Sequence, residues 1–111
     1  MKFLITIHRP HGYDFSQITA EVMRDIDAVN EEMVAAGVRI FVGGLQDPDT
    51  ATSIHWSADG ITQVEEGSLL RAEKYVNGLW VIEAASMEEA TEWGRKAALA
   101  CRGSVEVRAF H

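Results

Sequence analysis

The sequence has little cysteine, little positive charge and no long hydrophobic run. Its single cysteine, Cys101, excludes an intrachain disulfide and suits a reducing compartment. The 10 Lys and Arg residues are outnumbered by 17 Asp and Glu, which gives a net charge of -7. Because an acidic surface repels phosphate backbones and anionic lipids, we expect neither nucleic acid nor a membrane as a partner.

The apolar segments are also too short to target or anchor the chain. Phe3 to Ile7 is shorter than the apolar core of a signal peptide, and no small-residue cleavage site follows it. No apolar run approaches the ~20 residues that a membrane-spanning helix needs. The sequence therefore predicts a cytoplasmic protein.

What the chain does have is the composition of one globular domain. Its 111 residues are 47% hydrophobic and 24% charged, which is ordinary for a folded protein and unlike a disordered one. This length is enough for one hydrophobic core. We expect residues 1–111 to form a single domain without linkers or repeats.

Hydrophobic periodicity predicts strands that alternate with two helices. The predicted strands are Lys2–His8, Val38–Leu45, Ala51–Ser57, a short Ile61–Glu65, Gly78–Ala85 and Ser104–Phe110. The first predicted helix is Ile18–Ala36, with Asp14 as its N-cap and Gln17 in the capping-box position. The second follows the capping box Ser86–Glu89, and Gly37 and Gly103 are predicted to end the two helices.

This β-α-β-β-(β)-β-α-β order predicts an α+β fold. Without the minor hairpin strands it is the ferredoxin-like pattern, a sheet with both helices on one face. Strand alternation puts Thr6 and His8, with Glu106 and Arg108, on the uncovered face.

The uncovered face is predicted to be partly apolar, with Leu4, Trp80 and Ile82 beside the polar groups. A large apolar face is unfavourable in water. We therefore expect a second copy of the chain to pack against it, sheet to sheet, as a homodimer.

Three segments carry a resemblance to a known family. They are GLQDPDTATS (Gly44–Ser53), GSVEVR (Gly103–Arg108) and the helix end AAGV (Ala35–Val38). In order and spacing they resemble the YCII-related superfamily, specifically its DGPF branch, over nearly the whole chain. The resemblance implies a ferredoxin-like domain that forms a dimeric α/β barrel with a cleft. It also implies that the chain is related to lyases or isomerases of small, often aromatic, acids and to partners of transcription sigma factors.

The chain departs from this family at two places. The segment Glu66–Trp80 aligns with the Asp-Gly-Pro-Phe signature of the branch, and it retains Gly67 and Gly78 but loses most of the rest. Founding members of the superfamily are thought to use a histidine in the first helix. Ile18–Ala36 has none, so that role is not carried over to this chain.

The candidate catalytic residues are His8, as acid or base, and Glu106, as the carboxylate that orients it. Arg108 can hold a substrate carboxylate through two hydrogen bonds. Thr6 and Trp80 complete the candidate substrate-binding set, with Trp80 as an aromatic wall. The alternative is structural: Glu106 and Arg108 form an interfacial ion pair, and Trp80 packs at a dimer seam.

A metal site is a weaker hypothesis. His8, His11 and Asp14 are three residues apart and could supply two nitrogens and an oxygen. No helix holds them on one face, however, and Asp14 is better used as an N-cap. We expect no metal and no cofactor.

Two functions remain open on the sequence. One is a small-molecule enzyme or binder that performs cofactor-free proton transfer, of the lyase or isomerase type, on a small organic acid. The other is a non-catalytic dimeric interaction or sensor module, linked to transcription regulation, in which the same residues hold the dimer together.

Overall fold

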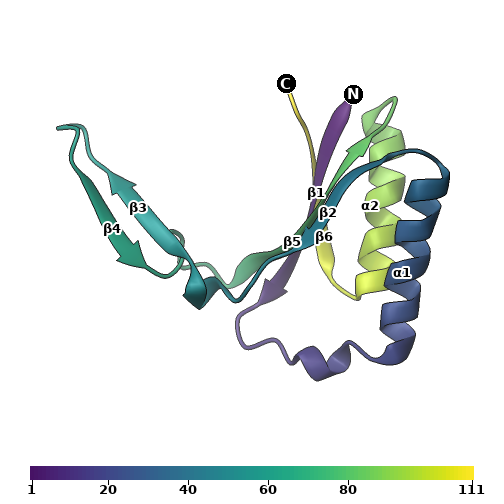
Figure 1. Cartoon of the computed structure of the whole chain (residues 1–111), viewed down its shortest axis with the longest axis horizontal. Coiled ribbons are helices and arrows are strands. Elements are labelled where there is room, and N and C mark those ends of the chain that lie inside the picture. Colours follow the sequence, from purple (N-terminus) through teal and green to yellow (C-terminus); the bar gives the residue numbers. More distant parts are fainter.

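The computed structural model describes residues 1–111 and contains two α-helices and six β-strands (Figure 1). The strands are β1 (Lys2–Pro10), β2 (Arg39–Gly44), β3 (Thr52–Trp56), β4 (Thr62–Glu66), β5 (Lys74–Glu83) and β6 (Ser104–Ala109). The helices are α1 (Ala20–Ala35) and α2 (Met87–Cys101), with short 3-10 helices η1 (Phe15–Gln17) and η2 (Pro48–Thr50).

Four strands form an antiparallel sheet in the order β2-β5-β1-β6, and both helices cover the same face of it (Figure 1). This is the predicted ferredoxin-like α+β arrangement. A single chain leaves the sheet open and does not close a barrel. Neither helix combines the length and apolarity that crossing a bilayer requires.

The core lies between the sheet and the helices. Its largest fully buried side chains come from β1, α1 and β5: Phe3, Ile5, Met33 and Ile82. Fully burying a side chain of this size contributes about 1.5–3 kcal/mol relative to leaving it exposed. Alternation along β1 is as predicted, because Phe3 and Ile5 are buried while Thr6 and His8 lie half-buried on the other face.

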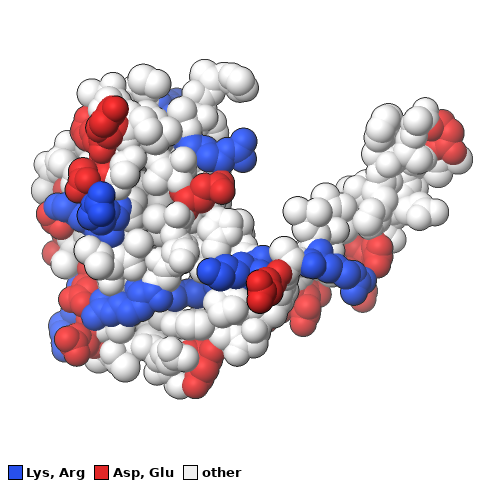
Figure 2. Space-filling model, turned by 180° about the vertical axis from the view of Figure 1, so that it is seen from behind, with Lys and Arg blue, Asp and Glu red and all other residues white.

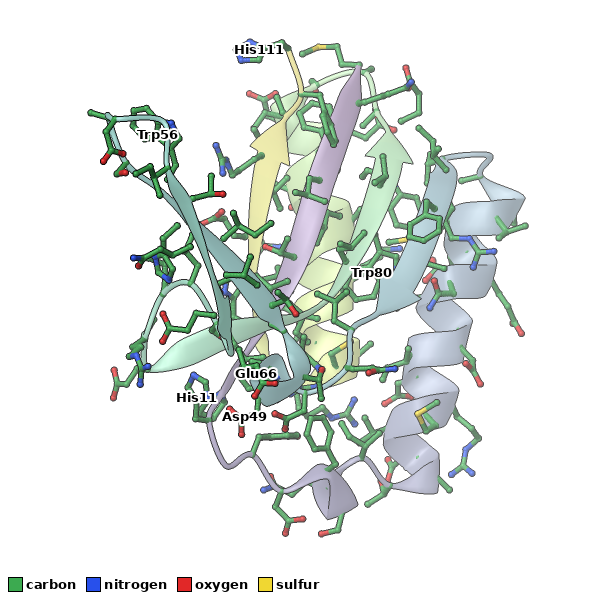
Figure 3. The ribbon with its side chains drawn as sticks, turned by 60° about the vertical axis from the view of Figure 1, so that its left-hand side comes forward. His11, Asp49, Trp56, Glu66, Trp80 and His111 are labelled. Carbon is green, nitrogen blue, oxygen red and sulfur yellow. The ribbon has the colours of Figure 1, made fainter.

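The predicted placement of Trp80 and Ile82 on the uncovered face is wrong. Trp80 pairs with Ile5, and Ile82 pairs with Phe3, across the β1–β5 ladder. Directly opposed residues in an antiparallel pair point to the same face, so both side chains point toward the helices. Trp80 is 5% exposed, and its indole Nε1 donates to Asn30 Oδ1 on α1 at 3.1 Å (Figure 3).

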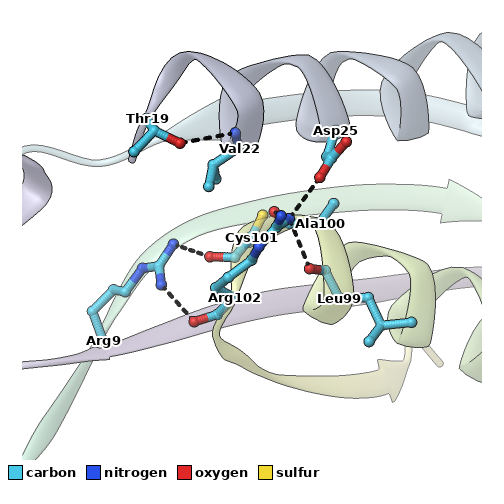
Figure 4. A network of polar contacts seen from close by, with 8 residues as sticks. All are labelled: Arg9, Thr19, Val22, Asp25, Leu99, Ala100, Cys101 and Arg102. Atoms are coloured by element: carbon cyan, nitrogen blue, oxygen red, sulfur yellow. Dashed lines mark hydrogen bonds and ion pairs between the residues drawn. The ribbon is translucent and has the colours of Figure 1, made fainter. Parts of the chain in front are cut away.

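The first helix begins later than predicted. Asp14 caps η1, where its carboxylate accepts a hydrogen bond from the backbone N–H of Ser16 at 2.9 Å. α1 starts at Ala20 with Thr19 as its N-cap, because the Thr19 hydroxyl accepts from the backbone N–H of Val22 (Figure 4). The stop at Gly37 is confirmed, since its φ of 71° is favourable only for glycine.

The second helix begins as predicted and ends one residue early. The Ser86 hydroxyl accepts from the backbone N–H of Glu89 at 3.2 Å. The left-handed residue at its end is Arg102, with φ 53°, rather than Gly103. Gly103 is needed for another reason, because a Cβ there would lie 2.8 Å from Nη1 of Arg9.

A glycine inside α2 lets the helix lie close to β6. A Cβ at Gly94 would lie 2.7 Å from Cγ2 of Val107. We expect Gly94→Ala to lower the free energy of unfolding by about 1–2 kcal/mol, because overpacking outweighs the gain of about 1 kcal/mol in helix propensity. Urea unfolding measures this, with exposed Leu99→Ala as a control that changes it by less than about 0.5 kcal/mol. A more stable Gly94→Ala protein would contradict the close packing.

The remaining two strands form a hairpin outside the main sheet. β3 and β4 pair only with each other and project from the sheet on the side away from the helices (Figure 1). The radius of gyration is 16.0 Å, against about 13 Å for a compact domain of 100 residues. Ile54, Trp56 and Val64 on this hairpin are 62%, 75% and 71% exposed.

Candidate functional site on the open face of the sheet

Four of the five candidate site residues lie on the open face of the sheet, on the neighbouring strands β1 and β6. Thr6 pairs directly with Glu106, and Leu4 pairs with Arg108, so the four side chains share that face. His8 lies one step further along β1, opposite Ser104. The structure therefore places Thr6, His8, Glu106 and Arg108 on one surface, in agreement with strand alternation.

The hydrogen bonds differ from the expected pairing. His8 Nε2 lies 2.9 Å from the Thr6 hydroxyl, and Glu106 is not bonded to His8. Glu106 and Arg108 are exposed and form no ion pair, with each other or with any other group of the chain. When Nε2 donates to Thr6, the lone pair of His8 is on Nδ1 and can accept a proton.

Apolar side chains continue this polar group across the sheet. Val81 of β5 pairs with Phe41 of β2 on one side and with Leu4 of β1 on the other. Leu79 of β5 pairs with Thr6. Phe41 is 58% exposed, and Leu4, Leu79 and Val81 are half-buried. The open face is thus apolar toward β2 and polar toward β6.

The hairpin turns this face into one wall of a notch. Figure 2 shows the notch between the body of the molecule and the projecting hairpin, whose outer part is mostly uncharged. A cavity of about 520 Å³ lies at the hairpin base, between Leu45, Thr50, Ile54 and Leu69. Val76 also lines it and is the β5 partner of His8, so the cavity adjoins the open face at His8.

The fold does not bring together the residues of two other predicted sites, the Trp80 wall and the metal site. Trp80 lies behind the sheet and is not a wall of the notch, whereas Trp56 lies at the far end of the hairpin (Figure 3). His8, His11 and Asp14 do not converge, and no group of three His, Cys, Asp or Glu side chains is arranged to hold a metal ion. Hydrogen bonds from Ser16 lower the pKa of Asp14 and engage its carboxylate locally.

The sequence interpretation missed Arg9, the one buried charged residue. Its guanidinium lies under α2, with Nη2 donating to the Cys101 carbonyl at 2.7 Å and Nη1 to the Arg102 carbonyl at 3.2 Å (Figure 4). These carbonyls end α2, where a cation is favoured. The signal was present, because Arg9 continues the inward alternation of Phe3, Ile5 and Ile7.

Cys101, at the end of α2, makes the stability of the protein depend on pH. Burial raises the pKa of its thiol above its ordinary value, although the Arg9 and Arg102 charges oppose this. The folded protein therefore keeps its proton at a pH where the unfolded chain loses it, so stability is lost as pH rises through and above the unfolded pKa. We expect the free energy of unfolding to fall more steeply from pH 8 to pH 10 in the wild type than in Cys101→Ala, measured by urea unfolding. Equal slopes would contradict this.

Comparison with known proteins gives a family for this chain. The model of the YCII-related domain matches residues 1–110 of this chain. An uncharacterised protein of Rhizobium meliloti (strain 1021), R00369, is 35% identical over 89 residues, which cover 78% of this chain and 71% of that protein.

Proposed function

Because the chain belongs to the YCII-related domain family, we propose that it is a homodimeric small-molecule-binding protein whose ligand is a small organic acid. The observation that carries the proposal is the uncommitted guanidinium of Arg108, on the same partly apolar face as the Thr6–His8 pair. A carboxylate accepts two hydrogen bonds from one guanidinium, and the apolar side chains toward β2 suit the body of such an acid.

The chemistry that this group supports is proton transfer without a cofactor. His8 would accept a proton from a carbon next to the bound carboxylate and return it to another carbon, which is an isomerisation. Thr6 would hold the imidazole through its bond to Nε2, and Glu106 would stabilise the imidazolium by its charge. Arg108 would keep the carboxylate in place throughout.

The proposed dimer would cover the exposed apolar surfaces. An isolated two-stranded hairpin is marginal in water, and Ile54, Trp56 and Val64 leave this one largely apolar. A second copy packed on the open face would cover Leu4 and Phe41 and would close the notch. This arrangement would remove water from the ligand and strengthen its bond to Arg108.

The test is a thermal-shift screen against small carboxylic and phenolic metabolites, with Arg108→Ala in parallel. A ligand at ~100 times its dissociation constant should stabilise the protein by about 2.7 kcal/mol. We expect this shift to vanish in Arg108→Ala and to persist in Arg95→Ala, which removes an exposed arginine of α2 that pairs with Glu92. If no acid in the panel loses its shift in Arg108→Ala, the assignment of the site to Arg108 is contradicted.

Light scattering tests the dimer separately. We expect a dimer at micromolar concentration and a weaker one when Trp56 is replaced by Ser. A monomeric wild type would contradict this part of the proposal.

The exposed hairpin favours a second candidate, a non-catalytic interaction module. In that case Ile54, Trp56 and Val64 would bind a protein partner, and the polar group on the sheet would be structural. His8→Ala separates the two functions. An enzyme would lose turnover and keep its dimer, whereas an interface residue would loosen the dimer.

A further inference from the structure

A separate cavity lies on the other side of the sheet, under the start of α1. Its volume is about 360 Å³, within the ~300–1,000 Å³ range of small-molecule sites. Ile18, Met23 and Ile26 line it from the helix side, and Val42 and Trp80 line it from the sheet. Most of its wall is therefore apolar.

Arg9 is the only charged residue in this wall. Arg9 is 4% exposed, and no carboxylate lies within ion-pair distance of its guanidinium. The two Nη atoms donate to the carbonyls that end α2, so the edge between them is already hydrogen-bonded (Figure 4). The Nε atom on its side edge has no hydrogen-bond partner and no contact with solvent.

This combination selects a chemical class of ligand. A guanidinium has five N–H donors, and the edge formed by Nε and one Nη matches the two oxygens of a carboxylate. A buried cation without a counter-ion favours an anion, and the apolar wall favours a hydrophobic body. We propose that this cavity binds a small monocarboxylic acid with an aromatic or branched apolar body, and that Arg9 holds its carboxylate.

The ring of Tyr13 stacks on one face of the Arg9 guanidinium. Its ring centroid lies 4.4 Å from the guanidinium carbon, and the ring packs edge-on against Phe15, which also lines the cavity. Tyr13 is half-buried in the loop that follows Gly12, whose φ is 76°. Because Nε has no contact with solvent, binding requires the side chains around this edge to shift so that the acid can accept a charged hydrogen bond from it.

Gly44 offers a way to fill the cavity without disturbing the core. It pairs with Gly78 on the helix-covered face and lines the cavity. A Cβ added at Gly44 would meet no atom within 4 Å, and its backbone does not need positive φ. Gly44→Leu should therefore fold and occupy the space meant for the ligand.

The experiment is an NMR titration that follows the indole N–H signals of the three tryptophans. Trp80 lines the cavity, whereas Trp56 is on the hairpin and Trp93 is on α2, so each signal reports one region. The probe is phenylacetate, with uncharged phenylacetamide as its matched control, and Trp80→Phe assigns the signal. We expect phenylacetate to shift Trp80 in the wild type and phenylacetamide to bind at least about tenfold more weakly, because it lacks the charge.

Two variants separate this site from the open face. Gly44→Leu should abolish the Trp80 shift, and Arg108→Ala should leave it unchanged. Three outcomes would overturn the proposal: no Trp80 shift at millimolar phenylacetate, equal binding of the amide, or a shift that survives Gly44→Leu. In each of them Arg9 would serve only to cap α2. Because Arg108→Ala tests the proposed function and Gly44→Leu tests this cavity, failure of one leaves the other intact.

Discussion

Replacing Ile5 by Ala is expected to lower the free energy of unfolding by about 2–5 kcal/mol, because Ile5 is fully buried between the sheet and the helices. The loss combines the transfer of the removed methylene groups with the cavity that they leave. The pairing of Ile5 with Trp80 and Val107 makes collapse of that cavity difficult, since these neighbours come from rigid strands on either side. Urea unfolding measures the change.

The adjacent residue is the matched control. Leu4 has the same number of side-chain atoms and lies on the same strand, but it is half-buried on the open face. We expect Leu4→Ala to lower the free energy of unfolding of the protomer by about 1 kcal/mol, roughly half of what a fully buried leucine side chain contributes. The loss of stability in Ile5→Ala should not depend on protein concentration. If Leu4 contacts a second copy in a dimer, the loss of stability in Leu4→Ala should grow with protein concentration. A larger concentration-independent loss for Leu4→Ala would contradict the assignment of faces.

Replacing Arg9 by Met is expected to have the second largest effect, a loss of about 2–4 kcal/mol. Met keeps most of the apolar length, but it leaves the Cys101 and Arg102 carbonyls without their charged donor. Hydrogen bonds to charged groups contribute about 1.5–3 kcal/mol each. Removing the guanidinium also removes the cost of burying its charge, which offsets part of this loss.

Arg102→Met is the control for Arg9→Met. Arg102 is an exposed neighbour whose guanidinium pairs with Asp25 at 2.8 Å (Figure 4). Its Nη1 also donates to the Leu99 and Ala100 carbonyls at 3.2 and 2.8 Å. Because Arg102 is exposed, water can replace these bonds and the ion pair is worth at most about 1 kcal/mol, so the variant should lose less stability than Arg9→Met. If Arg9→Met were equally mild, Arg9 would not anchor the end of α2, and its burial would need another cause.

Local sequence signals found most elements of the fold. The strand alternation of Phe3 and Ile5, the cap at Ser86 and the stop at Gly37 act over a few residues, so they can be read without tertiary structure. The start of α1 was missed because Asp14 and Thr19 both have the chemistry of an N-cap, and Asp14 is used by the short helix η1 instead. The same local alternation placed Thr6, His8 and Arg108 on one face.

The candidate site was only partly predictable. His8 and Glu106 were correctly placed on one face, but the hydrogen-bond partner of His8 is Thr6, two residues away on its own strand. Alternation fixes which face a side chain points to, and it does not fix rotamers. Arg9 was missed because the predicted strand Lys2–His8 ends before it, whereas β1 continues through Arg9 to Pro10.

The sequence by itself determined the class of fold, the alternation of β1 and β6 and the acidic character of the surface. Only the tertiary structure decided which face of β5 meets the helices, because a shift of one residue in strand register moves every side chain to the opposite face. It also decided that β3 and β4 form a hairpin outside the main sheet. The alternation of their side chains fits a place inside the sheet equally well. The buried environment of Arg9 likewise depends on α2, whose terminal carbonyls lie more than 90 residues away in the chain.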